Sequence, residues 1–469
     1  MSFSITYLQE PELMFLHGSS FTPMVGLIKH GARFSIPEET TKWMKVGIIG
    51  SSQSLSLTLN LLEEMRHVQV PKKIAKWNIP FPGLSENSPL HFAISFKPEW
   101  QQKITQEEIE KINSETTRTK RTEAFAQKID EKLRIIYENI SPPPDVVIVT
   151  IPLEIEKKCM DPTREKPLLK LPKGDDLHSR IKLSGMKYKI PTQLIRNDTL
   201  IFHKTQEKSI VFWNLAVGLL YKSQKGYPWK LAKFEPSSCY VGISFFHDSS
   251  DTSSDMRACM AQVFLDTGES YVLRGKAFEW RDRFHLKNPH LPKEGAKEII
   301  KDVLSQYKAV RGVAPERIVI HKSSNYWDEE KEGFLEGAQQ IHSKDFLTIQ
   351  PSDLKYYREG KYPVLRGTLI SLSSMDEHFL YTTGMVPCLN TYPGLGIPRP
   401  VNIRCPIQSS PIQTISQEIL AFTKLDWNNT FVYQKIPITM SVSDKVKMVL
   451  ADSSAKEMKE LDPHYYYYM

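Results

Sequence analysis

Four side chains in the middle of the chain could together surround a phosphate group. His178 and Lys182 stand four residues apart, so on a helix they share one face about one turn apart. Gln193 follows at a predicted strand end, and Lys222 lies near the end of a predicted helix. Lysines supply charge, while the amide and imidazole supply hydrogen-bond donors. Taken singly, each residue also has an ordinary interpretation: helix-face charges for the lysines, a partly buried ring for the histidine and a strand end for the glutamine.

The composition is compatible with a phosphate-rich partner. The 469 residues include 61 Lys and Arg against 54 Asp and Glu, a formal charge of +7, which is a mild surplus. Hydrophobic residues make up 40% and charged residues 25%, which excludes collagen-like, coiled-coil and wholly disordered chains. The length predicts two or three domains.

The cysteines and the hydropathy pattern predict a cytoplasmic protein. The five cysteines include no C-x-x-C pair, which argues against a disulfide scaffold or a zinc site and favours a reducing compartment. The N-terminus lacks the basic and apolar regions of a signal peptide. No stretch approaches 18 uninterrupted apolar residues, so we expect no membrane span.

The elements that must position the four side chains begin with an α/β pattern. Residues 1–40 read as short strands and turns broken by Pro and Gly. Apolar strands are predicted from Lys45, His91 and Asp145, with a helix after the first and a charge-dense helix over 101–140 between the last two. That long helix has an apolar stripe at Phe125, Ile129, Leu133, Ile136 and Ile140. Strand–helix alternation of this kind predicts a parallel, Rossmann-like sheet covered by helices.

The second half shows a different order of elements. Three strand-like runs begin at Tyr240, Ala258 and Tyr271, and a helix is predicted over 292–310. A strand at 317–321, another helix and a further strand from Phe346 complete the series. This order is that of a ribonuclease-H-like fold, in which acidic residues at the tips of the first and fourth strands hold two metal ions for phosphodiester cleavage.

Taken in order, these features resemble the MID and PIWI domains of Argonaute proteins. The length is similar to that of short prokaryotic Argonautes, which lack the N-terminal and PAZ domains. Three segments add to the resemblance: Glu10–Phe15, Gly394–Val401 and the aromatic C-terminus Pro463–Met469. The resemblance implies N-terminal strands that pack on PIWI (1–40), a MID domain (41–232) and a ribonuclease-H-like PIWI domain (233–469).

The resemblance also implies a pocket for the 5′-phosphate of a guide strand. Lys182, Gln193 and Lys222 match the phosphate ligands of the family, and His178 stands where the family usually has a tyrosine that stacks on the first base. The C-terminal carboxylate of Met469, with Gln193, would help to hold a structural Mg²⁺ ion there.

Active PIWI domains hold two Mg²⁺ ions with a tetrad of mostly acidic residues, and here the pattern is degenerate. Ser244 and Ser323 stand at the first and third positions, and only the last position carries an acid, Asp444. The mobile glutamate of the tetrad is not placed, and Glu269 is a weak candidate. A serine hydroxyl is a poor Mg²⁺ ligand, so we expect a chain that is not itself an enzyme.

The function implied is guide-directed recognition of single-stranded DNA, with a small RNA as the usual guide. Base pairing would read the sequence while the protein holds the backbone. In short Argonautes such a subunit is a sensor in defence against viruses or plasmids. It forms a heterodimer with an APAZ-containing effector that carries a TIR, sirtuin-like or nuclease domain. Two alternatives stay open: a guided nuclease that cuts the target itself, and an unguided single-strand binder.

Overall fold

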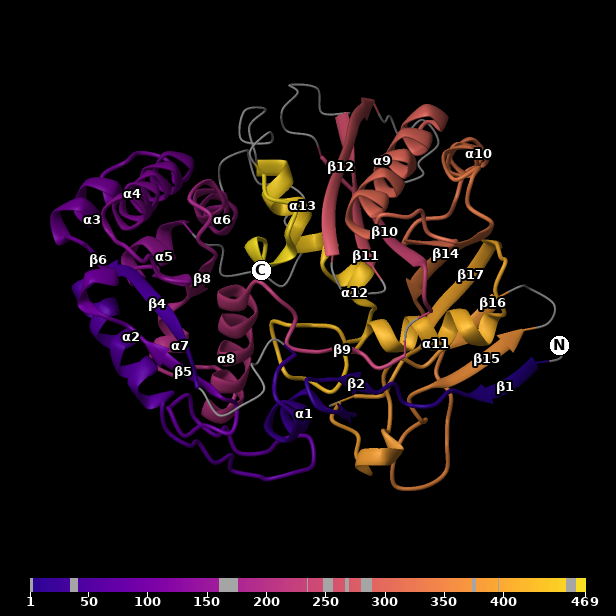
Figure 1. Ribbon diagram of the computed structural model, residues 1–469, viewed down its shortest axis with the longest axis horizontal. Helices are drawn as coiled ribbons and strands as arrows, with labels where there is room; N and C mark the ends of the chain where they lie inside the picture. Colours follow the sequence, from indigo (N-terminus) through magenta and orange to yellow (C-terminus); the bar gives the residue numbers. More distant parts are fainter. Residues whose placement is uncertain are drawn as a thin grey trace.

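The chain folds around two large sheets that lie side by side, with the C-terminus between them (Figure 1). The computed structural model describes residues 3–33, 41–159, 176–233, 235–247, 256–265, 270–279, 289–372, 377–394, 396–452 and 461–469. Within these ranges, no helix is both long enough and apolar enough to cross a membrane.

The first large sheet is parallel, as the sequence predicted. Its strands follow the order β5-β4-β7-β8, and β6 also pairs with β4. They are β4 (Lys42–Ser51), β5 (Phe92–Ser95), β6 (Gln101–Ile104), β7 (Val146–Thr150) and β8 (Thr192–Ile195). Every residue of β7 is buried, because helices cover both faces of the sheet.

The helices of this half are α2 (Ser52–Glu64), α3 (Gln106–Asn113), α4 (Arg118–Asn139), α5 (Leu153–Cys159), α6 (Leu177–Lys187), α7 (Asn197–Leu200) and α8 (Lys208–Gln224). The apolar stripe of α4 is confirmed from Phe125 to Ile136, whose four members are fully buried. The prediction of one helix over 101–140 is wrong, because β6 and α3 precede α4. Thr105 forms a capping box with Glu108 that starts α3, and Thr117 caps α4.

The second large sheet has nine strands in the order β1-β15-β16-β17-β14-β13-β10-β11-β12. Its strands are β1 (Phe3–Tyr7), β10 (Ser238–His247), β11 (Met256–Leu265), β12 (Ser270–Glu279), β13 (Arg317–Lys322), β14 (Ser343–Pro351), β15 (Thr368–Leu372), β16 (Glu377–Leu380) and β17 (Val401–Ile407). β10, β11 and β12 are antiparallel, while β10, β13 and β14 are parallel. This arrangement is the ribonuclease-H-like fold that the element order predicted.

Helices cover both faces of this sheet as well. α9 (Lys293–Arg311) and α10 (Asp328–Gly337) share one core with β10 and β13. α11 (Ile412–Phe422), α12 (Ile438–Ser441) and α13 (Ser443–Asp452) lie on the other face. Short 3₁₀ turns occur at η1 (Pro98–Trp100), η2 (Pro387–Leu389) and η4 (Tyr465–Tyr467).

The N-terminal segment divides between the two halves. β1 (Phe3–Tyr7) pairs with β15, whereas β2 (Leu13–Met14) and β3 (Ser19–Ser20) form a small sheet with β9 (Lys230–Leu231). The expectation of strands and turns alone is wrong here, because Pro23–His30 forms the helix α1. Proline at the first helical position is compatible with this start.

A buried ionic cluster ties the N-terminal segment to the second half. The Glu10 carboxylate contacts Arg366 at 2.8 Å and Lys424 at 2.6 Å, and all three side chains are at most 5% exposed. Burial alone would raise the pKa of Glu10, but the two cations outweigh it and lower that pKa. Lys424 also donates to the carbonyl of Phe21, so residues 10 and 21 are held by one ammonium group.

A continuous apolar core joins the two halves through α8. Trp213, Leu220 and Tyr221 of this helix belong to the same buried cluster as Trp427 and the C-terminal tail. The tail rings of Tyr465 and Tyr466 lie 6.3 and 6.0 Å from the ring of Tyr221. The halves therefore share packing, and α8 carries side chains into their junction.

Candidate functional site

Two buried lysines from different helices meet on strand β8. Lys182 of α6 is 1% exposed and donates from Nζ to the backbone carbonyl of Thr192. Lys222 of α8 is fully buried and donates from Nζ to Oε1 of Gln193. Because Thr192 and Gln193 are adjacent in β8, the structure brings three of the four predicted phosphate-binding residues together.

Local signals place these side chains. Asp176 caps α6 by accepting from the backbone N–H of Ser179 at 3.1 Å. His178 therefore lies in the first turn of α6, partly exposed, one turn before Lys182. α8 ends at Lys225 in the left-handed conformation (φ 51°), which puts Lys222 in its last turn. A cation is favoured near a helix C-terminus because of the helix dipole.

Both acceptors on β8 are neutral oxygens. A phosphate group placed here would bring negative charge and accept short, charge-assisted hydrogen bonds from both lysines. The arrangement therefore suits a terminal phosphate in charge and in donor type.

The C-terminal tail reaches the same end of α8. Tyr465 and Tyr466 pack on Tyr221, the residue before Lys222, and Met469 is only 4% exposed. η4 contacts both α6 and α8, and the C-terminus lies beside these helices (Figure 1). On the other side, Val272 of β12 donates to the carbonyl of Pro463 at 3.0 Å. The tail thus connects the lysine pair with the nine-stranded sheet.

A residue from the second half also faces this site, and the sequence did not predict it. A Cβ at Gly218 would lie 3.7 Å from Oε1 of Gln193 and 3.6 Å from Oδ1 of Asn428. Asn428 follows the buried Trp427, and its backbone N–H donates to Asp426 at 2.9 Å. Gly218, one turn before Lys222 in α8, therefore lies between the side-chain amide of Gln193 in the first half and that of Asn428 in the second half. Nothing local in the sequence marks Asn428, because the contact joins segments far apart in the chain.

The two serines expected at acidic tetrad positions are neighbours across parallel strands. Gly242 and Ile243 of β10 pair with His321 and Lys322 of β13, and the next residues are Ser244 and Ser323. Ser323 is exposed, and its carbonyl accepts from Gln350 Nε2 at 2.7 Å. The Oγ of Ser244 is buried and has no hydrogen-bond partner within the described ranges. The two serines therefore lie where the parallel pairing of β10 with β13 stops, Ser244 within β10 and Ser323 directly after β13.

Helix α12 packs directly on the strands before these serines. A side chain at Gly242 would overlap the carbonyl of Thr439, so only glycine allows this approach. His321 is fully buried, and its Nδ1 lies 2.7 Å from Oγ1 of Thr439. Burial, together with the charge of Arg317, lowers the pKa of His321 to about 3, so the ring is neutral at pH 7.

The other two candidates for the tetrad lie partly or wholly outside the described residues. Asp444 lies in α13, which contacts β10, but its side chain is outside what the structure describes, as is Glu269 altogether. Lys322 forms a fully buried ion pair with Glu330 of α10. Within the described residues, no group of three or more His, Cys, Asp or Glu is placed to hold a metal ion. The loss of the tetrad stays a prediction.

Solved structures share this architecture. Clostridium butyricum Argonaute, bound to a guide DNA and a 19-mer target DNA, superposes with a TM-score of 0.64 at 18% identity. The match covers 96% of this chain and 53% of that protein. A. aeolicus Argonaute matches with a TM-score of 0.56 and 18% identity over the same shares. The chain has an Argonaute fold. Its Rossmann-like half corresponds to MID and its ribonuclease-H-like half to PIWI, and it spans about half the length of these Argonautes. No family model and no curated protein matches the sequence.

Proposed function

We propose that the chain binds a short guide strand by its 5′-phosphate and uses it to recognise single-stranded DNA.

 The guide is expected to be a small RNA, and base pairing with it would select the target. The observation that carries this proposal is the convergence of Lys182 and Lys222 on β8 beside the C-terminal tail. The fold supports it, because an Argonaute of the same architecture holds a guide and a target DNA.

Within this proposal, different side chains of the pocket contact different parts of the guide end. Lys182 and Lys222 bind the terminal phosphate, and the partly exposed ring of His178 offers a flat surface to the first base. Asn428 contributes an amide from the PIWI half. These groups recognise a phosphorylated end and leave the rest of the strand free to pair.

The residue types present are suitable ligands for a structural Mg²⁺ ion. Gln193 supplies an amide oxygen and Met469 a terminal carboxylate, which are the hard oxygen ligands that Mg²⁺ takes. The Gln193 oxygen already accepts from Lys222, so an ion here would share that oxygen. When bound, the ion would offset repulsion between the guide phosphates and the C-terminal carboxylate.

We further propose that the target stays uncut. Ser244 lies in β10 just beyond its last parallel pair with β13, and Ser323 directly follows β13, where a two-metal nuclease needs carboxylates. Recognition without cleavage requires another protein to produce an output. We therefore propose that this chain is the sensor subunit of a prokaryotic defence system and activates an APAZ-containing effector with a TIR, sirtuin-like or nuclease domain.

The direct test of guide anchoring compares two RNAs of one sequence, one with a 5′-phosphate and one with a 5′-hydroxyl. The phosphorylated RNA should bind far more tightly, because only it engages both lysines. Equal affinities would contradict the proposal and favour an unguided single-strand binder.

A further inference from the structure

The two edges of the nine-stranded sheet differ in how they are protected. β12 forms one edge, where the C-terminal tail covers the start of the strand and Arg274 and Lys276 follow. β1 forms the other edge, and its five residues include no charge and no proline. Figure 1 shows β1 at the outer side of the molecule, next to β15. Proteins usually block such an edge with a charge, a proline or a covering segment, because an open edge strand pairs readily with another strand.

The peptide groups of alternate β1 residues point away from β15. Leu8, directly after β1, donates its N–H to the carbonyl of Gly367, directly before β15, at 2.9 Å. Because the direction of hydrogen bonding alternates along an antiparallel pair, the N–H and C=O groups of Phe3, Ile5 and Tyr7 face outward. Within the described ranges, no strand pairs with this side of β1.

The side chains of the same three residues form an exposed apolar row. Phe3, Ile5 and Tyr7 are 54%, 57% and 39% exposed. Ile5 pairs with Ile370, which is fully buried in a small core cluster together with Phe379. The row therefore continues a buried core to the open edge of the sheet. Apolar side chains and outward peptide groups occur at the same three positions, which is the combination that strand addition uses.

The order of residue types in β1 selects a second copy of the chain as the occupant of this edge. Read in either direction, the strand is aromatic, hydroxyl, isoleucine, hydroxyl, aromatic. In an antiparallel pair with Ile5 opposite Ile5 of the second copy, Phe3 lies opposite Tyr7 and Ser4 lies opposite Thr6. The outward peptide groups of the two strands then face one another and form up to about six backbone hydrogen bonds. The register that matches the peptide groups therefore also matches the side chains.

We propose that two copies of the chain associate by antiparallel pairing of their β1 strands about a two-fold axis at Ile5. The two nine-stranded sheets then form one continuous sheet, and the contact closes on itself, so it gives a dimer and not a fibre. The apolar row offers roughly 300 Å² of exposed side chain, which is below the about 800 Å² per partner of a standard interface. The dimer is therefore weak, with a dissociation constant on the order of 10 μM.

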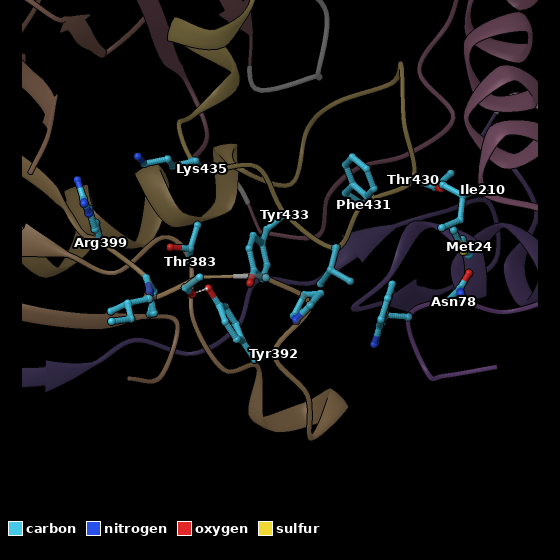
Figure 2. Close-up of a pocket in the computed structure, with 17 residues that line it drawn as sticks. Met24, Asn78, Ile210, Thr383, Tyr392, Arg399, Thr430, Phe431, Tyr433 and Lys435 are labelled. Carbon is cyan, nitrogen blue, oxygen red and sulfur yellow. Dashed lines mark hydrogen bonds between the residues drawn. The ribbon is translucent and has the colours of Figure 1, made fainter. Parts of the chain in front are cut away.

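This contact uses none of the residues of the proposed guide pocket. Lys182 and Lys222 lie in the first half of the chain. A cavity of about 490 Å³ lies between the start of α8 and the loops that contain residues 392–399 and 430–435 (Figure 2), and no described residue of β1 lines it. The inference therefore does not rest on guide binding, and variants of β1 should bind a guide as tightly as the unsubstituted chain.

Sedimentation equilibrium of the chain from about 1 to about 100 μM tests the dimer. The unsubstituted chain should change from monomer to dimer within this range. Ile5→Lys places two like charges opposite each other, so the dissociation constant should rise about tenfold or more. Ile201→Lys is the matched control, because Ile201 is 50% exposed and lies in the first half of the chain. It should leave the dissociation constant unchanged.

Cysteine cross-linking with the oxidant diamide tests the register, in a Cys388→Ser background because Cys388 is exposed. Ile5→Cys should form a disulfide with its own copy, since directly opposite residues lie about 5.5 Å apart at Cα. Ser4→Cys should not, because it lies opposite Thr6. The inference is overturned if the chain stays monomeric, if Ile5→Lys and Ile201→Lys have equal dissociation constants, or if Ser4→Cys cross-links as readily as Ile5→Cys. It is also overturned if a different protein pairs with β1 while the chain itself stays monomeric.

Discussion

Replacing Lys182 and Lys222 together with alanine separates anchoring of the guide end from general nucleic-acid binding. A hydrogen bond to a charged group contributes roughly 1.5–3 kcal/mol, so the loss of two amounts to about 3–6 kcal/mol. Because 1.4 kcal/mol is a tenfold change, the affinity for a 5′-phosphorylated guide should fall about 100-fold or more. A 5′-hydroxyl guide should be affected much less.

The fold of this variant must be checked, because both lysines are buried. Alanine leaves the Thr192 carbonyl and the Gln193 amide oxygen without these donors, which costs roughly 1–3 kcal/mol each. Methionine at both positions fills more of the space but, like alanine, removes the charge and the donors. Lys187→Ala is a control on the same helix, since this side chain is half exposed and pairs with Asp130 at 2.9 Å.

Fluorescence anisotropy with matched 5′-phosphate and 5′-hydroxyl RNAs measures the effect. The salt concentration must be constant, because contacts with phosphates weaken steeply as salt rises. The reasoning is refuted if a folded double variant loses the same affinity for both RNAs. It is also refuted if Lys187→Ala reproduces the selective loss.

Other predictions concern cleavage, stability and partners. With guide, Mg²⁺ or Mn²⁺ and matched DNA, the chain should leave the target intact, and product bands opposite the middle of the guide would contradict the assignment of Ser244 and Ser323. The pKa of about 3 for buried His321 lies below its ordinary value, so the unfolded state takes up the proton first as pH falls. Lowering the pH from about 6.5 to about 5 should therefore reduce the free energy of unfolding by roughly 2 kcal/mol through His321. The loss of unfolding free energy between pH 7 and pH 5, measured by urea unfolding, should be smaller in His321→Gln than in the unsubstituted chain. Equal losses in the two would count against this. Glu10→Gln should destabilise by about 3–5 kcal/mol because it leaves two buried cations without their acid, and an unchanged melting temperature would disprove that. A pull-down from the native host should recover an effector whose NAD consumption or DNA degradation starts on target addition, and a chain that runs alone with no such activity would refute the sensor role.

Strong local patterns predicted much of the fold. The run of apolar residues in β7 and the stripe of α4 are visible without tertiary information, and the element order after Tyr240 indicated the second sheet. Weaker local signals were missed. α1 begins at Pro23 among strand-like residues, and the capping box at Thr105 divides a segment that reads as one helix.

The candidate site shows the same limit. His178 and Lys182 could be paired from their spacing because one helix carries both. The position of Asn428 beside Gly218 depends on how PIWI packs against α8, and no short-range pattern encodes that contact. The contact of Glu10 with Arg366 likewise joins segments more than 350 residues apart, which spacing cannot reveal.

Nucleic acid that copurifies with the chain gives the most direct test of guide binding. The extracted strands can be labelled at their 5′ ends by a kinase, with and without prior phosphatase treatment, and then sized and sequenced. Our account predicts short strands of narrow length that label only after phosphatase treatment, because Lys182 and Lys222 select a 5′-phosphate. Strands of mixed length that label equally well without phosphatase treatment would contradict it.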